Sequence, residues 1–147
     1  MVMSKIPVYF MPGLAASPTI FENIKLPEDQ FEMHFLEWFL PNDKESIESY
    51  ALRMTEKIQN ENPVLVGVSF GGILVQEMAK HIKTQKVIII SSVKSNTEFP
   101  PRLKMARATK AYKLLPTQLL SNVELLVKYA FGNNIVAKRL KLYEKYL

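Results

Sequence analysis

The chain has 147 residues, of which 48% are hydrophobic and 22% are charged, and its formal net charge is +5. This length and balance are typical of one ordinary globular domain and exclude wholesale disorder. The absence of cysteine excludes a disulfide scaffold, a cysteine-type zinc finger and a cysteine nucleophile. No apolar segment resembles a signal peptide or approaches the roughly 18 residues that a membrane-spanning helix needs. We therefore expect a cytoplasmic protein without a membrane span.

The positive net charge belongs to the last third of the chain. Residues 1–100 carry nine basic and twelve acidic side chains, whereas residues 101–147 carry ten basic and two acidic ones. Such a segment can bind an acidic partner, nucleic acid or an anionic membrane. Because no RNA-binding or DNA-binding signature accompanies these lysines, we interpret them as the outer faces of amphipathic helices and expect no nucleic acid as a partner.

Short apolar runs alternate with amphipathic stretches over residues 5–92. This alternation is typical of a mainly parallel sheet with helices on both faces, a three-layer α/β/α fold. Ser17-Pro18 and an Asn42–Glu45 capping box are the expected starts of the first two helices. Strands are predicted at residues 6–10, 31–38, 63–67 and 86–91, and helices at 17–24, 42–58 and 70–83.

Helical spacing of apolar side chains predicts one buried face on each of the second and third helices. Trp38 and Phe39, which end the second strand, are interpreted as packing residues, with the entrance of a site as the alternative. After Ser92 the pattern becomes helical, and three helices are expected between residues 102 and 147. The expected buried faces consist of Ile47, Tyr50, Ala51, Met54 and Ile58, and of Leu74, Val75, Met78, Ala79 and Ile82.

Residues 67–71, GVSFG, are the one motif that carries chemistry. The G-x-S-x-G pattern lies between a buried apolar strand and a helix, where a sharp turn holds Ser69 in a strained conformation with its hydroxyl above the sheet. Gly67 and Gly71 come close together across this turn, so larger side chains would collide there. The N-terminus of the helix supplies N–H groups where an oxyanion would form. An ordinary helix-capping turn is the alternative.

A second glycine turn, Met11-Pro12-Gly13-Leu14, follows the first strand. Parallel strands end at one edge of the sheet, and ligands of open α/β sheets bind at that edge. We therefore expect this turn to lie beside the G-x-S-x-G motif, with an ordinary strand-end turn as the alternative interpretation.

With these two loops the sequence resembles the α/β-hydrolase superfamily over residues 5–92. GVSFGG looks like the nucleophile elbow of that family, and Pro12-Gly13-Leu14 looks like its oxyanion loop. The resemblance implies that Ser69 is the nucleophile and that the backbone N–H groups of Leu14 and Phe70 bind the oxyanion. It also implies a strand order of second, first, third, fourth, and a hydrolase core (1–94) followed by a helical cap (95–147).

The catalytic base and acid of that family have no clear counterpart in the chain. His81 lies twelve residues after Ser69 on one predicted helix, about 18 Å away, and His34 lies in mid-strand about 13 Å below the carboxyl edge. A general base must approach to about 3 Å. Three residues are candidate acids. Asp29 and Asp43 are expected on the rim of the site, and Glu98 is interpreted as a surface charge.

We therefore expect the N-terminal part of a longer hydrolase that cleaves an ester, thioester or amide of a small acyl substrate through an acyl-enzyme at Ser69. Residues 1–147 alone are expected to be nearly inert, because a serine without a base is a poor nucleophile. The alternatives are a catalytically dead module that binds a small apolar ligand, and a charge-driven role of residues 101–147.

No cofactor and no metal are expected, since no cluster of histidine and carboxylate residues has ligand spacing. The unfinished edge of the sheet at the fourth strand favours pairing with a second copy of the chain, so a homodimer is a further expectation.

Overall fold

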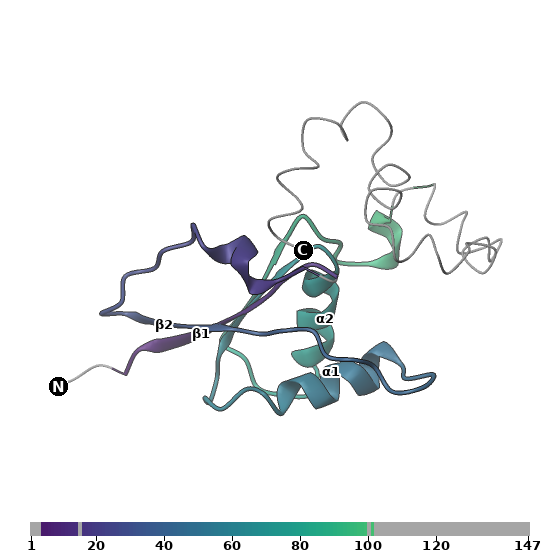
Figure 1. Ribbon diagram of the computed structural model, residues 1–147, viewed down its shortest axis with the longest axis horizontal. Helices are drawn as coiled ribbons and strands as arrows, with labels where there is room; N and C mark the ends of the chain where they lie inside the picture. The colour runs from purple at the N-terminus through teal and green to yellow at the C-terminus, as the bar shows by residue number, and fades with distance from the viewer. Residues whose placement is uncertain (1–3, 15, 100, 102–147) are drawn as a thin grey trace. The chain divides into compact units, whose positions relative to one another are not determined.

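The computed structural model describes residues 4–14, 16–99 and 101. The chain divides into two compact units, Met1–Lys94 and Ser95–Leu147. The first unit contains the sheet and both α-helices of the described residues (Figure 1). The three helices expected in the second unit lie outside the described residues, so the cap stays a prediction. No helix in the described ranges is long and apolar enough to cross a membrane.

Four parallel strands form one sheet in the order β2-β1-β3-β4. This is the predicted order, and the all-parallel pairing confirms the small α/β fold. β3 lies between β1 and β4 and is apolar throughout, as is typical of an inner strand of a parallel sheet. The strands are β1 (Ile6–Met11), β2 (Phe31–Phe35), β3 (Val64–Val68) and β4 (Lys86–Ile90).

Both α-helices, α1 (Ile47–Thr55) and α2 (Phe70–Met78), pack on the same face of the sheet (Figure 1). The predicted buried stripes are confirmed except at Ile82, because their central residues form this core and Ile47, Ile58 and Ala79 pack at its margin. Ile82 lies beyond the end of α2 and is not part of this core. β1 contributes every second residue, as the alternation of side chains along a strand requires. The buried core of this face consists of Tyr9, Met11, Leu36, Tyr50, Ala51, Met54, Leu65, Leu74, Val75 and Met78.

The predicted start of α1 at an Asn42–Glu45 capping box is wrong. Ser46 is the N-cap, and its side-chain oxygen accepts a hydrogen bond from the Ser49 N–H at 3.2 Å. The Asn42 N–H does donate to the Glu45 carboxylate, at 2.9 Å, but this contact closes a turn that precedes the helix. Lys44 has a positive φ of 54°, which interrupts any right-handed helix that begins at Asn42, so the helix starts only after this turn.

Three other predicted elements are shorter in the structure. The segment after Ser17 forms only a 3-10 turn, η1 (Pro18–Phe21), and α2 ends at Met78 rather than at residue 83. β2 ends at Phe35 rather than at residue 38, because the chain turns away from the sheet and carries Trp38 toward the end of β1.

The second face of the sheet carries no α-helix within the described residues. η1 covers part of it, with Phe21 packed against Phe10 at a ring distance of 5.1 Å. On the same face, Ile88 and Ile90 of the edge strand β4 are each 40% exposed. The third layer of the expected fold therefore stays a prediction, as does the pairing of a second copy at β4.

Candidate active site

Ser69 has a backbone conformation that no capping role explains. Its φ of 54° and ψ of −121° lie outside the left-handed helical region, whose ψ is positive, and such a conformation is costly for a residue with a side chain. Ser69 is the N-cap of α2, yet its side chain makes no capping hydrogen bond. Ser17 and Ser46, in contrast, have extended backbones and cap their helices through side-chain oxygens. The exposed hydroxyl of Ser69 is thus presented at the sheet edge without a capping role.

The two glycines that flank Ser69 allow this turn by packing closely against backbone atoms. A Cβ atom on Gly67 would collide with the carbonyl oxygen of Gly71, which is the close approach that the motif predicts. A Cβ atom on Gly71 would in turn collide with the Pro12 carbonyl oxygen and lie 2.5 Å from that of Met11. The end of β1 and the start of α2 are therefore in direct backbone contact.

The residues after β4 hold the turn from its other side. The Ser69 N–H donates to the Ile90 carbonyl at 2.9 Å, and the Ser92 hydroxyl donates to the Ser69 carbonyl at 2.7 Å. Ser92 fits there because Gly72 has no side chain: a Cβ on Gly72 would lie 2.5 Å from the Cβ of Ser92. No sequence pattern predicts this support, and its only signal is a small hydroxyl residue after the fourth strand.

The loop after β1 brings the predicted oxyanion donor Leu14 to the same place. Position 13 adjoins Ser69, since a Cβ on Gly13 would lie 3.6 Å from the Ser69 Cβ. The Gly13 carbonyl accepts hydrogen bonds from the Ala16 N–H at 3.0 Å and from the Trp38 indole N–H at 2.6 Å. In a trans peptide the C=O and the next N–H point in opposite directions, so these two bonds also fix the direction of the Leu14 N–H.

Phe70, the second predicted donor, is the first residue of α2, and the first N–H groups of an α-helix have no acceptor within the helix. Its ring packs 5.8 Å from that of Trp38, which also lies 5.8 Å from Tyr50. Trp38 therefore packs, as the sequence suggested, and also binds the predicted oxyanion loop. That hydrogen bond joins residues 25 positions apart and has no signal in the sequence.

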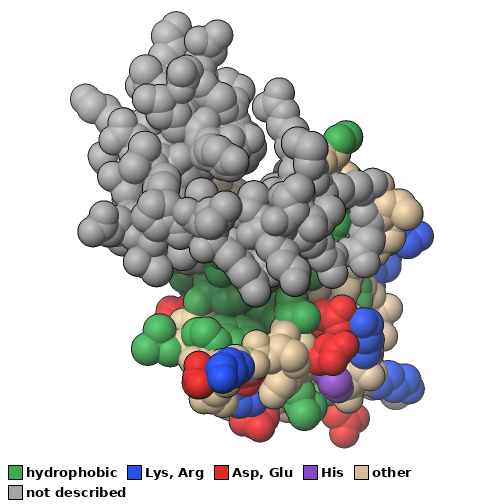
Figure 2. Space-filling model, turned by 90° about the vertical axis from the view of Figure 1, so that its right-hand side faces the viewer, with side chains coloured by type: hydrophobic (Ala, Val, Ile, Leu, Met, Phe, Trp, Pro, Cys, Tyr) green, Lys and Arg blue, Asp and Glu red, His purple; other side chains and the backbone are tan. Residues whose placement is uncertain are grey.

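An apolar cavity of about 350 Å³ adjoins both predicted oxyanion donors. Its walls come from the two glycine loops, the segment after β2, and helices α1 and α2. Figure 2 shows the side of the molecule on which α1 and the segment after β2 lie in Figure 1. Hydrophobic side chains gather on this side, and charged side chains lie at the margin of the hydrophobic area. The lining residues are Leu14, Trp38, Phe39, Pro41, Glu45, Ser46, Ile47, Tyr50, Phe70 and Leu74.

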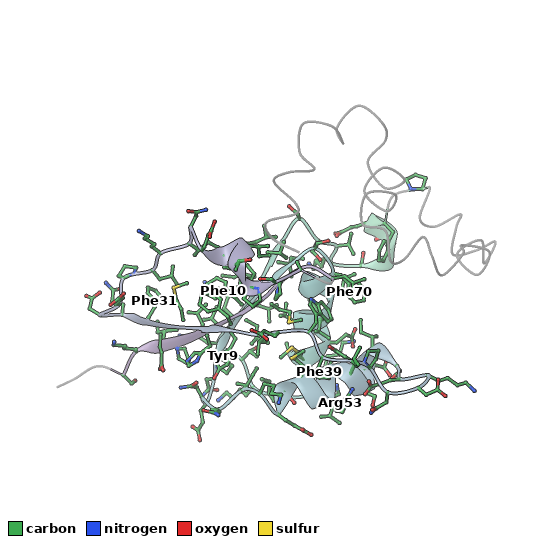
Figure 3. The ribbon with its side chains drawn as sticks, viewed as in Figure 1. Tyr9, Phe10, Phe31, Phe39, Arg53 and Phe70 are labelled. Atoms are coloured by element: carbon green, nitrogen blue, oxygen red, sulfur yellow. The ribbon has the colours of Figure 1, made fainter. Side chains whose placement is uncertain are left out.

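An ion pair holds the wall of this cavity in place (Figure 3). Arg53 donates two hydrogen bonds to the Glu45 carboxylate, at 2.7 and 2.6 Å, and its guanidinium lies 4.6 Å from the centre of the Phe39 ring. The Tyr50 hydroxyl donates to the Phe39 carbonyl and accepts from the Phe39 N–H. The hydrogen bonds from Arg53 lower the pKa of Glu45, and burial raises the pKa of Tyr50, so the carboxylate stays charged and the phenol neutral at pH 7.

The lowered pKa of Glu45 predicts an acid-dependent loss of stability. The folded protein binds this proton less readily than the unfolded chain, so the pair stabilises the fold above the ordinary pKa of 4.5 and loses that contribution as the pH falls through the lower folded-state pKa. We expect the melting temperature of the wild type to fall more steeply below pH 4.5 than that of Glu45→Gln. Glu48→Gln, an exposed carboxyl change on α1, should keep the wild-type slope, and three equal slopes would contradict the prediction.

Neither histidine lies near Ser69. His34 pairs in register with Tyr9, on whose ring it stacks at 4.4 Å, and Tyr9 pairs in turn with Leu65, four residues before Ser69. This places His34 about 13 Å below Ser69 along the strand direction, although β2 ends one residue after His34 and the histidine is not in mid-strand as expected. His81 is exposed beyond the far end of α2, about 18 Å from the serine. The described residues therefore supply no imidazole base to this site.

The candidate acids are scattered. Asp29 precedes β2 and so lies at the amino edge of the parallel sheet, which corrects the expectation that it lies on the rim of the site. Asp43 is exposed in the loop before α1, and Glu98 belongs to the second unit. Within the described ranges, no group of three or more histidine and carboxylate side chains could hold a metal ion.

No protein-family model and no curated protein matches the sequence.

Proposed function

We propose that the chain carries the nucleophile half of a serine hydrolase of the α/β-hydrolase type. One observation carries the proposal: Ser69 stands in a strained conformation at a strand-to-helix turn, and its hydroxyl makes no capping bond. Strain of this kind persists where the surrounding structure imposes it, and it gathers at functional sites. The proposal includes a three-layer core, with further helices over the face that holds Ile88 and Ile90.

The proposed reaction proceeds through an acyl-enzyme. The Ser69 Oγ attacks the carbonyl carbon of an ester, thioester or amide, and the C=O electron pair moves to the oxygen. The resulting oxyanion accepts hydrogen bonds from the Leu14 and Phe70 N–H groups. When the C=O bond re-forms, the alcohol, thiol or amine leaves with the proton that Ser69 lost. Water then attacks the acyl-enzyme in the same way, which releases a carboxylic acid and restores the serine.

The proton of Ser69 must pass through a general base, and we propose that this base comes from outside the described residues. His34 and His81 are too far away, so the described core by itself has a nucleophile and oxyanion donors but no imidazole within reach of Ser69. A site of that kind retains only a residual fraction of the full rate.

The missing base suggests a direct test by chemical rescue. We expect the 147-residue chain to hydrolyse p-nitrophenyl butyrate slowly, and imidazole in solution to raise the rate because it takes the place of the base. The Ser69→Ala variant should show only the background reaction of imidazole with the ester. Ser92→Ala, which changes a neighbouring serine that is not the nucleophile, should keep a measurable rescue. Equal rates for the wild type and Ser69→Ala at every imidazole concentration would contradict the proposal.

A binding module without catalysis is the second candidate function. It is favoured by the apolar cavity beside a site whose described residues include no base. Retained ligand binding, together with the absence of any Ser69-dependent rescue, would establish this alternative.

A further inference from the structure

We infer that the cavity beside Ser69 binds a neutral, apolar acyl chain of medium length, so that the substrates are medium-chain esters or thioesters. This inference rests on the proposed function for the chemistry of the carbonyl group. The inference that the cavity binds an acyl chain rests only on the geometry and the lining of the cavity.

The position of the cavity indicates that it holds the acyl group, which is the part of the substrate attached to the carbonyl carbon. A carbonyl oxygen held by the N–H groups of Leu14 and Phe70 places its carbon within reach of Ser69. The side chains of Leu14 and Phe70 line the cavity, as does Leu74 one turn further along α2. A chain attached to that carbon therefore enters the space between these side chains and α1.

The polar atoms of the cavity wall are already paired within the protein. The Trp38 N–H donates to Gly13, and the Tyr50 hydroxyl both donates to and accepts from Phe39. Both oxygens of Glu45 accept from Arg53, and the Glu45 side chain is only 2% exposed.

The Ser46 hydroxyl accepts from a backbone N–H at the start of α1. The remaining lining side chains are hydrocarbon or aromatic. Apart from the Ser46 O–H, the lining side chains offer a charged or strongly polar group no free partner for the hydration it would lose, and such burial is costly. A neutral apolar chain has no hydrogen bonds to water to lose, which selects it over a hydroxylated or charged one.

The volume limits the length of the chain. At about 30 Å³ for each close-packed water-sized group, a cavity of about 350 Å³ holds about ten to twelve non-hydrogen atoms. Each methylene that enters an apolar environment improves binding about fourfold. Affinity should therefore rise steeply with chain length and become constant at about ten carbons, beyond which the chain extends into solvent.

Binding can be measured without catalysis because Trp38 is the single tryptophan of the chain and lines the cavity. We would titrate the 147-residue Ser69→Ala protein with 2-alkanones of four to fourteen carbons, which carry a carbonyl group but cannot be hydrolysed, and follow the tryptophan emission. The expected result is a blue shift, with affinity rising about fourfold per methylene up to about ten carbons. The absence of a shift, or affinities independent of chain length, would overturn the inference.

Two substitutions at one lining position should move the length limit in opposite directions. Ile47 lies at the start of α1 and lines the cavity, so Ile47→Phe should shorten the best chain and Ile47→Ala should lengthen it. Leu52→Phe adds the same ring to the exposed side of α1, where Leu52 is 51% exposed, and should leave the limit unchanged. A limit that does not move in either Ile47 variant, with the fold intact by circular dichroism, would also overturn the inference. If both variants fail to fold, the length series of the parent protein still decides it.

The failure of this inference is distinguishable from the failure of the proposed function. Imidazole-rescued turnover at Ser69 with flat alkanone binding would leave the hydrolase proposal in place and remove the acyl pocket. Length-dependent alkanone binding without any Ser69-dependent turnover would retain the pocket and remove the hydrolase.

Discussion

Gly71→Ala is expected to destabilise the protein by about 3 kcal/mol or more, because the added methyl collides with backbone rather than with a movable side chain. The new Cβ would meet the Pro12 carbonyl oxygen and lie 2.5 Å from that of Met11. Relief requires α2 to move away from the end of β1, which separates the two loops that form the site. For a domain of this size, the loss corresponds to a fall in melting temperature of more than about 10 °C.

Gly13→Ala is the matched control for this prediction. Its added methyl would lie 3.6 Å from the Ser69 Cβ, an ordinary contact distance, so the melting temperature should fall by far less. Thermal denaturation followed by circular dichroism measures both variants. Equal melting temperatures for Gly71→Ala and the wild type would mean that the backbone contact between β1 and α2 does not exist as described.

Trp38→Phe is expected to reduce kcat of the imidazole-rescued reaction about 10- to 100-fold. The phenyl ring retains much of the packing on Phe70 and Tyr50 but cannot donate to the Gly13 carbonyl. The Leu14 N–H then loses part of its fixed direction. The loss should remain below the ~10²–10³-fold cost of deleting an oxyanion donor outright. Because the interaction strengthens in the transition state, KM should change little.

Tyr9→Phe provides the control for a lost hydrogen bond. The Tyr9 hydroxyl donates to Asn60 at 2.5 Å and accepts from the Gln59 N–H, well below the carboxyl edge of the sheet. This variant should lose some stability and keep kcat. A fall in kcat of similar size in both variants would show that Trp38 acts through general stability and not through the oxyanion loop.

The sequence predicted the sheet and its central turn because both depend on local patterns. Apolar runs separated by amphipathic stretches require parallel strands with crossover helices. The spacing of Gly67, Ser69 and Gly71 requires a tight turn wherever it lies between a strand and a helix. The predicted strand order and the close approach of the two glycines are accordingly both found in the structure.

The remaining parts of the site depend on contacts between distant segments. The early end of β2 and the bond from Trp38 to Gly13 arise only when the segment after β2 crosses to the end of β1. The Glu45 carboxylate also accepts from Arg53, eight residues further along the chain, and Lys44 has a positive φ of 54° that a helix starting at Asn42 could not contain. The contacts from Trp38 and Arg53 join residues that no short sequence window holds together, so sequence patterns could not predict them.

Mass-spectrometric mapping of the residue labelled by an alkyl fluorophosphonate in the presence of imidazole decides whether Ser69 is the nucleophile. We expect a single adduct on the peptide that contains Ser69, formed faster with imidazole than without it and absent from Ser69→Ala. An adduct on another serine, or equal labelling of the wild type and Ser69→Ala, would contradict this expectation.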